Sequence, residues 1–228
     1  MLWLLLIVVV LALVFGPAVW VKWVMRAHGD EIDGLPGTGG ELAQHLLERF
    51  EVEGVGVEAI AGGDHYDPEA RMVRLSEANF NNKSLTAVAV AAHEVGHALQ
   101  HHHGDRRLAA RTKLVPFADR VARLSTGLIW AAPIVGVITR HPVPFSALVL
   151  MGIAGLVARM LVHLVTLPTE WDASFGKALP MLIEGQYIAP AEEVVVRKIL
   201  RAAALTYVSA ALADVLNLMR WLALLLRR

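Results

Sequence analysis

Apolar residues in this chain gather in four blocks, which two polar stretches separate. The blocks are residues 1–21, 124–139, 141–169 and 202–226. The first block carries no charged side chain, and its length is close to the roughly 20 residues that a helix needs to cross a bilayer. The link between the second and third blocks, around Arg140, is so short that these two blocks must form an antiparallel helical hairpin.

The first apolar block predicts a membrane helix that stays attached to the mature protein. No Lys or Arg precedes Lys22, whereas a secretory signal peptide normally begins with a positive charge. Trp20 and Trp23 flank this lysine, as aromatic residues do where a helix leaves the membrane. A cleaved signal peptide is the alternative interpretation.

The polar stretch between the first and second blocks predicts a small α+β unit. Thr38 and Glu41 have the spacing of a capping box ahead of an amphipathic helix. Residues 55–61 alternate in the manner of a strand, and a proline-containing turn leads into a second strand at 71–75. A long helix is expected over 85–102, because polar capping residues precede it and a glycine follows it.

Composition supports a membrane protein and excludes several other classes. Hydrophobic residues make up 56% of the 228 positions and charged residues only 18%, which is too apolar for a disordered chain or an ordinary soluble domain. The chain has no cysteine, so disulfides, thiolate nucleophiles and cysteine zinc sites are impossible. Lys and Arg total 21 and Asp and Glu also total 21, which gives no support to a nucleic-acid partner.

The long helix contains the segment His-Glu-Val-Gly-His at residues 93–97, an HExxH motif. His93 and His97 lie four residues apart, so both rings project from one helix face and can bind the same zinc ion. Glu94 would then act as the general base that activates the zinc-bound water. Two hydrogen-bonded core histidines are the alternative reading of this pattern.

A catalytic zinc site needs a third protein ligand, and Glu170 is the best candidate. The predicted hairpin returns Glu170 to the same side of the membrane as the histidines, and Asp172 is the fallback ligand. His101 lies about 12 Å along the helix from His93, which is too far to share one ion. His103 occupies the third-histidine position of the metzincin pattern, but that pattern needs a glycine where this chain has Gln100.

Several separated segments resemble the bacterial membrane neutral zinc metallopeptidases, the YugP-like family, over nearly the whole chain. These segments are HEVGHALQHHHG at 93–104, HYDP at 65–68 with RLS at 74–76, VTLPTEWDAS at 165–174 and RAAALTY at 201–207. The resemblance implies a gluzincin-like site in which His93, His97 and Glu170 bind one catalytic zinc ion and Glu94 is the base. The Glu170 segment is more distantly similar to that of the CAAX prenyl proteases and heat-shock membrane proteases, with Ser174 in place of their aspartate.

Other residues have expected supporting roles. Histidine and tyrosine side chains that could polarise the scissile carbonyl are His65, Tyr66 and Tyr207, and each has a purely structural role as its alternative. An edge strand made of Arg71, Met72, Val73, Arg74 and Leu75 could pair with an extended peptide substrate. A plain hairpin strand that packs on the helix is the alternative for that segment.

Charge placement predicts which side of the membrane the zinc site faces. Cations flank the soluble stretch, whereas the hairpin loop carries only Arg140, so the positive-inside rule places the site in the cytoplasm. Arg227 and Arg228 oppose this orientation unless the fourth block lies in the membrane interface. Within the apolar blocks, Arg159 and Asp214 are expected to pair, or alternatively to face a water-filled cleft near the zinc.

The resulting expectation is a mainly α integral membrane protein with three to four membrane helices. Its compact cytoplasmic domain would combine a gluzincin-like HExxH helix with a small β-hairpin. The expected order is a transmembrane helix (1–24), a zincin-like α+β domain (25–115), two transmembrane helices (116–140 and 141–167), a cytoplasmic segment with the third ligand (168–201) and a membrane or interfacial helix (202–228).

The expected function is that of a membrane-embedded zinc metalloendopeptidase at the cytoplasmic face of the bacterial plasma membrane. Its expected partners are the lipid bilayer and a peptide or membrane-protein substrate. The alternative is a non-catalytic membrane scaffold or assembly protein with a structural or vestigial zinc site. An intact Glu94 argues against this alternative, because a structural zinc site needs no general base.

Overall fold

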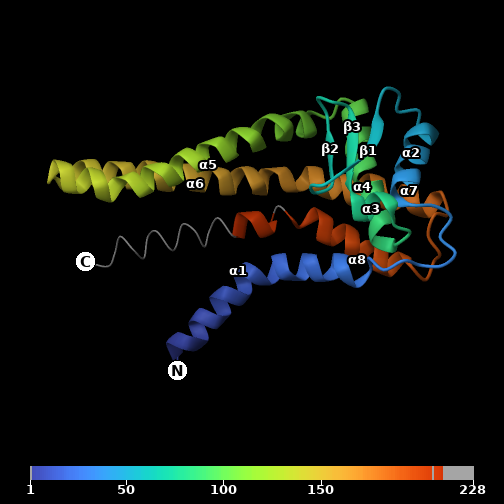
Figure 1. Ribbon diagram of the computed structural model, residues 1–228, viewed down its shortest axis with the longest axis horizontal. Helices are drawn as coiled ribbons and strands as arrows, with labels where there is room; N and C mark the ends of the chain where they lie inside the picture. Colours follow the sequence, from blue (N-terminus) through green and yellow to red (C-terminus); the bar gives the residue numbers. More distant parts are fainter. Residues whose placement is uncertain (1, 207, 213–228) are drawn as a thin grey trace. The chain divides into compact units, whose positions relative to one another are not determined.

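The computed structural model describes residues 2–206 and 208–212 and is mainly helical, with a small sheet (Figure 1). Its elements are α1 (Leu2–Ala27), α2 (Gly39–Arg49), β1 (Gly56–Ile60), β2 (His65–Asp67), β3 (Met72–Ser76), α3 (Glu77–Asn81), α4 (Leu85–His102), α5 (Arg106–Thr139), α6 (Pro142–Trp171), the π-helix η1 (Asp172–Ala178), α7 (Leu179–Glu184) and α8 (Glu193–Ala204). The predicted combination of a helical chain with a small β-structure is confirmed.

The chain forms two compact units. One unit comprises residues 18–109 and 167–206, and the other contains residues 110–166 together with the first part of α1. We call the first of these the catalytic unit because it contains the HExxH segment that the sequence predicts to be catalytic. It brings together two polar stretches that are separated in the sequence by the second and third apolar blocks. Every residue of the candidate site described below belongs to the catalytic unit.

Helix α4 is the buried centre of the catalytic unit. The side chain of Ser84 accepts a hydrogen bond from the Ala87 N–H and caps the helix at its beginning. All residues from Leu85 to Gln100 are buried, and many of them are alanine or valine. These small side chains let α2, η1 and α8 pack closely around α4. The environment of the two histidines is therefore fixed on several sides.

The three-stranded sheet has the order β1–β3–β2, which corrects one prediction. β3 pairs with β1 in parallel and with β2 in antiparallel fashion, so the segment 71–75 supplies the central strand rather than an edge strand. Val73 and Leu75 are fully buried, while Arg74 on the opposite face forms ion pairs with Glu58 of β1 and Asp67 of β2. The proposed pairing of a peptide with 71–75 is therefore wrong, because both sides of β3 are already occupied.

Helices α5 and α6 form the antiparallel hairpin that the short link predicts. Only Arg140 and His141 separate the two helices, and Arg140 turns the chain with a φ of 51°. Gly152 and Gly155 of α6 face α5 so closely that a Cβ at either position would collide with Ile129 or Ser125. Small residues at such crossings are typical of helix pairs in membranes.

The charge within the third apolar block has a partner on α5. Arg159 Nε lies 3.1 Å from an oxygen of Asp119, so the structure supplies an ion pair within the hairpin. Asp214, the partner expected for Arg159, lies outside the described residues. The expected Arg159–Asp214 pair consequently stays a prediction.

Among the residues that the structure describes, two helical stretches are long and apolar enough to cross a membrane, and they run over Arg106–Thr139 and Pro142–Glu184. The second stretch joins α6, η1 and α7 into one continuous helix. They correspond to the second and third apolar blocks. Membrane roles for the first and fourth blocks stay predictions.

Candidate metal centre

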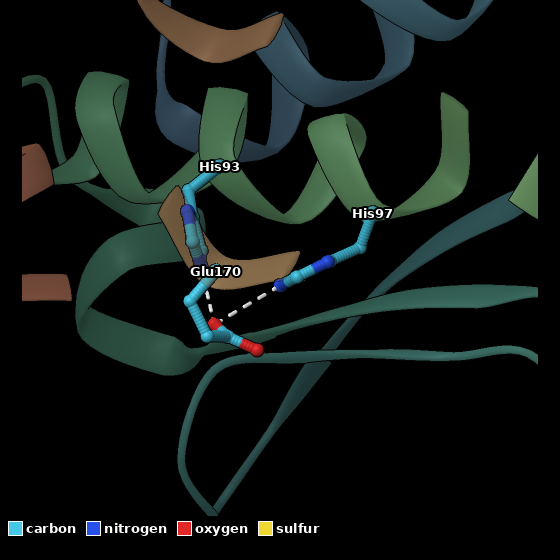
Figure 2. Close-up of side chains that lie close together, drawn as sticks. All are labelled: His93, His97 and Glu170. Atoms are coloured by element: carbon cyan, nitrogen blue, oxygen red, sulfur yellow. Dashed lines mark ion pairs between the residues drawn. The ribbon is translucent and has the colours of Figure 1, made fainter. Parts of the chain in front are cut away.

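The structure brings the two histidines of α4 and Glu170 of α6 together. His93 Nε2 lies 3.5 Å from Glu170 Oε2, and His97 Nε2 lies 3.4 Å from the same oxygen (Figure 2). All three side chains are buried, with 5%, 1% and 1% of their surface exposed, respectively. One ligand atom from each residue lies within 4.8 Å of the others. This arrangement could hold a metal ion.

A serine of η1 fixes the His93 ring. The Ser174 hydroxyl donates a hydrogen bond to the Leu200 carbonyl oxygen at 3.1 Å, so its proton is committed to that acceptor. Ser174 Oγ also lies 3.0 Å from His93 Nδ1 and must accept the ring N–H there. The Nδ1 proton of His93 is thereby held by Ser174. The other ring nitrogen, Nε2, faces Glu170.

A glutamine one helical turn further along fixes the His97 ring in the same way. Gln100 Nε2 donates to the Thr169 carbonyl oxygen at 3.0 Å and to an Asp172 carboxylate oxygen at 2.8 Å, which uses both amide hydrogens. The remaining Gln100 oxygen, 2.9 Å from His97 Nδ1, accepts the ring N–H. Both histidines therefore direct Nε2 to the same point, with Nδ1 bound by a supporting side chain, which is the orientation that metal binding requires.

The donor set fits a zinc ion. Two neutral imidazoles and one carboxylate form one of the ligand sets of catalytic zinc sites. Ligands bound at 2.0–2.1 Å with tetrahedral angles are separated by about 3.3–3.4 Å, close to the separations of the histidine nitrogens from Glu170 Oε2. His97 Nε2 is a buried atom that receives no hydrogen bond from the part of the chain that the structure describes. A cation at this point would satisfy it.

Glu94 follows His93 directly on α4, and its side chain is 6% exposed. Its carboxylate makes no hydrogen bond or ion pair with any residue in the ranges 2–206 and 208–212. A nearly buried carboxylate is costly unless it has a partner. The structure thus keeps a nearly buried carboxylate in the residue that follows the ligand candidate His93 on α4.

Gly96 permits the close approach of α4 and η1. A Cβ at Gly96 would lie 2.7 Å from the backbone oxygen of Ala173, a distance that real contacts do not allow. The close packing of α4 against η1 therefore requires a glycine at position 96, inside the His-Glu-Val-Gly-His segment. It lets the α6–η1 helix come near enough to supply Glu170, Ser174 and the carbonyl of Thr169.

The remaining candidates lie in different surroundings. Asp172, the fallback ligand, accepts the hydrogen bond from Gln100 and lies 3.6 Å from the ammonium of Lys177. His65 is exposed, with Nδ1 2.9 Å from the Gly63 carbonyl oxygen. Tyr207 lies outside the described residues. Asp172 therefore supports the His97 ring indirectly, as a partner of Gln100.

Tyr66 is buried, and its hydroxyl lies 2.8 Å from Nδ1 of His101, one turn beyond His97 on α4. Burial is the main influence on the pKa of this hydroxyl and raises it, while the nearby Arg71 opposes the shift. Tyr66 therefore stays protonated, and can act as a hydrogen-bond donor, over the neutral range.

The supporting residues were only partly visible in the sequence. Ser174 lies in one of the segments that carry the family resemblance, which marked its position but not its use of the Leu200 carbonyl. Gln100 lies three residues after His97 and thus on the same helix face, which is the signal that could have identified it. Its two acceptors come from 69 and 72 residues further along the chain, which no local pattern reveals.

Comparisons with known proteins agree with this geometry. The chain is 34% identical over 217 residues to "Putative membrane protease YugP" of Bacillus subtilis (strain 168), a match that covers 92% of each chain. No solved structure matches the chain. The model of one protein family, described as "Putative neutral zinc metallopeptidase", matches residues 3–226. Buried ligands of the right type and a match over nearly the whole length lead to one conclusion: the chain belongs to this family of neutral zinc metallopeptidases.

Proposed function

We propose that this protein is a zinc metalloendopeptidase of the bacterial plasma membrane that hydrolyses peptide bonds at the cytoplasmic face. One observation carries the proposal. The Nδ1 atoms of His93 and His97 each bind a supporting side chain, and their Nε2 atoms converge on Glu170. The residue after His93, Glu94, is a nearly buried carboxylate with no hydrogen-bond or ion-pair partner among the described residues. A site that only stabilised the fold would need the three ligands and no adjacent base.

The residues divide the chemistry between them. His93, His97 and Glu170 would hold one zinc ion, which as a Lewis acid makes water more acidic and a carbonyl more reactive. Glu94 takes the proton from the attacking water at a carboxylate oxygen and gives it to the nitrogen of the leaving amine. Gln100 and Ser174 keep the imidazoles in the binding tautomer. Tyr66 and His65 are candidates for polarising the scissile carbonyl, together with Tyr207.

The membrane location rests on two observations. Two helical stretches have the length and composition of membrane spans, and a relative that matches over 92% of its length is named a membrane protease. With the positive-inside rule, the cations around the catalytic unit favour the cytoplasm for the site. The lipid bilayer and a peptide or membrane-protein substrate are the proposed partners.

The test uses the purified full chain in detergent, with zinc content and cleavage of a peptide library measured on each variant. Glu94→Gln should retain one zinc per chain and lose activity by about 10²- to 10⁴-fold, because the proton acceptor is gone. His97→Ala should lose the zinc. Glu53→Gln, which removes an exposed carboxylate of the same unit, is the matched control and should behave as wild type.

Three outcomes would overturn the proposal. Undiminished cleavage by zinc-loaded Glu94→Gln would refute the role of the base. A wild-type chain that binds zinc firmly but cleaves no member of the library would instead support the scaffold alternative. A wild-type chain without zinc would refute both interpretations of the site.

A further inference from the structure

The last turns of α1 are built into the catalytic unit. Thr86 at the beginning of α4 donates its hydroxyl to the Met25 carbonyl oxygen at 2.9 Å and its N–H to the His28 carbonyl oxygen at 3.1 Å. Val24 is fully buried in the core of the unit. The end of the first apolar helix is therefore fixed to the same helix that carries His93 and His97.

Next to this buried attachment, α1 and α8 present an exposed aromatic and apolar surface. Trp23 and Val19, one turn apart on α1, are 56% and 63% exposed, and Val194 of α8 is 75% exposed. The ammonium of Lys198 lies 4.4 Å from the centre of the Trp23 ring, which joins the two helices through a cation–π contact. Val194 and Lys198 are also one turn apart, so they lie on the same side of α8.

We call this surface, together with the cations around it, the basic-aromatic face. The cations are Lys22 and Arg26 of α1 and Lys198 and Arg201 of α8. None of these four side chains forms an ion pair or hydrogen bond with a residue that the structure describes. Arg197, by contrast, is held by Glu193 at 2.7 Å. A hollow of about 480 Å³ on α1 is lined by Val19, Lys22, Trp23, Arg26 and Ala27 and by no acidic residue.

We propose that the basic-aromatic face binds the phosphate of an anionic phospholipid and so holds the catalytic unit against the headgroup layer. This inference rests on the proposed membrane location. Exposed cations without an acidic partner attract an anion, and exposed Trp and Val side chains favour an apolar environment. An anionic phospholipid supplies both at one place. The face also continues directly from the uncharged stretch of α1, which is where headgroups would lie.

The experiment is native mass spectrometry of the full chain in detergent, titrated with dioleoylphosphatidylglycerol or dioleoylphosphatidylcholine. Wild type should retain the anionic lipid at least tenfold more tightly than the zwitterionic one. Each cation near the surface contributes roughly a fivefold effect, so Arg26→Gln with Lys198→Gln should weaken phosphatidylglycerol binding by about 25-fold. The control, Arg197→Gln with Lys83→Gln, removes two cations elsewhere on the unit and should bind as wild type does.

Several results would overturn the inference. One is equal affinity of the wild type for the two lipids, and another is that the control pair weakens phosphatidylglycerol binding as much as the test pair does. A third is displacement of the lipid by millimolar inorganic phosphate, which would identify an anion site without lipid preference. Circular dichroism verifies the fold of each variant, and Lys198→Arg should keep wild-type binding because it keeps the charge. The lipid measurement needs no peptidase substrate, so the two proposals fail separately. An active enzyme without a preference for the anionic lipid contradicts this inference alone. An inactive chain that still prefers the anionic lipid contradicts the proposed function alone.

Discussion

The two histidines are oriented by different chemical groups. His93 is held by a neutral serine hydroxyl, whereas His97 is held by an amide that is itself fixed by the Asp172 carboxylate. A direct carboxylate partner makes an imidazole more basic, and neither ring has one at Nδ1. In both partners the hydrogens are bound elsewhere, so the oxygen that faces Nδ1 acts as an acceptor of the ring N–H. The Nδ1 proton is therefore held in each ring without a carboxylate in direct contact.

Replacement of Ser174 by alanine should loosen the metal rather than abolish it. The change leaves His93 Nδ1 and the Leu200 carbonyl without their common partner, which should lower zinc affinity by about 10- to 100-fold. Competition with a chelator measures this directly. Ser146→Ala, at an exposed position of α6, is the control, and unchanged zinc affinity in Ser174→Ala would contradict the assigned role.

Gly96→Ala should destabilise the catalytic unit even though alanine favours helices over glycine. The added Cβ would press on the Ala173 backbone oxygen at 2.7 Å, and overpacking of this kind costs about 1–3 kcal/mol. The thermal unfolding midpoint should fall, and zinc content should fall with it as Glu170 moves away. Gly127→Ala in α5, where nothing lies within 4 Å, is the matched control. A midpoint as high as that of the control would contradict the packing argument.

The ligand residues could be predicted from the sequence, whereas their supports could not. His93 and His97 follow from the period of a helix, and Glu170 follows from the resemblance together with the hairpin topology. Gln100 and Ser174 depend on backbone carbonyls of Thr169 and Leu200, whose positions exist only in the folded chain. The amino-acid sequence does not reveal a hydrogen-bond acceptor that is a backbone carbonyl, because every residue has one.

Among the elements, the sheet departs most from expectation. The strands predicted at 55–61 and 71–75 correspond to β1 and β3, whereas β2, which pairs with β3 across the proline-containing turn, was not predicted. β1 pairs with β3 in parallel although β2 lies between them in the sequence. Such non-local pairing leaves no local signal in the sequence. The consequence is that Arg74 becomes a central residue with an acidic partner on each flanking strand.

The β2–β3 pairing should weaken in acid. The pKa of Asp67 is lowered chiefly by the Ala70 N–H, with further contributions from the Glu69 N–H and from Arg74. A lowered pKa in the folded state stabilises the fold above the unfolded value of about 3.9, and this stabilisation is lost as the pH falls through the lower folded value. Amide exchange of β2 and β3 in wild type and Asp67→Asn should therefore differ at neutral pH and converge in acid. A difference that persists below pH 2 would contradict the assignment.

The α5–α6 hairpin should not tolerate larger residues at its crossing. Gly155→Val would drive a side chain into Ser125 and Val121, so the two helices must separate. The unfolding midpoint in detergent should drop by several degrees, consistent with a cost of about 1–3 kcal/mol. Gly136→Ala, whose nearest neighbour Phe145 lies at an ordinary contact distance of 3.4 Å, should be tolerated. Equal midpoints for the two variants would argue against close helix packing here.

For the whole molecule, the charge balance of zero conceals an uneven distribution. Acidic residues are nearly confined to the two polar stretches that form the catalytic unit, while the hairpin loop carries Arg140 as its only charged residue. The apolar blocks were predictable because a helix that crosses a bilayer needs a long uncharged run, and such runs can be read directly along the sequence. The division of one compact unit between residues 18–109 and 167–206 was predictable only through the hairpin that separates them.

The proposed orientation can be tested because the chain has no cysteine. A single cysteine at Glu53 of the catalytic unit or at His141 in the hairpin loop reports on one site each, and both positions are exposed. In intact cells a membrane-impermeant maleimide should label His141→Cys and spare Glu53→Cys, and lysis should expose both. Labelling of Glu53→Cys in intact cells would reverse the proposed orientation.

The two-residue link at Arg140 and His141 lies between the two halves of the metal centre in the sequence. The ligand candidates before the link, with Gln100, are on α4, and Glu170 and Ser174 after it are on α6 and η1. Opening the chain at this link would give two polypeptides, one with both imidazoles and Gln100, the other with the carboxylate and Ser174. Neither fragment contains a complete ligand set, so co-expressed halves would regain the metal only by reassembling. The hairpin thus makes this protein a natural subject for fragment complementation, with bound zinc as the signal of association.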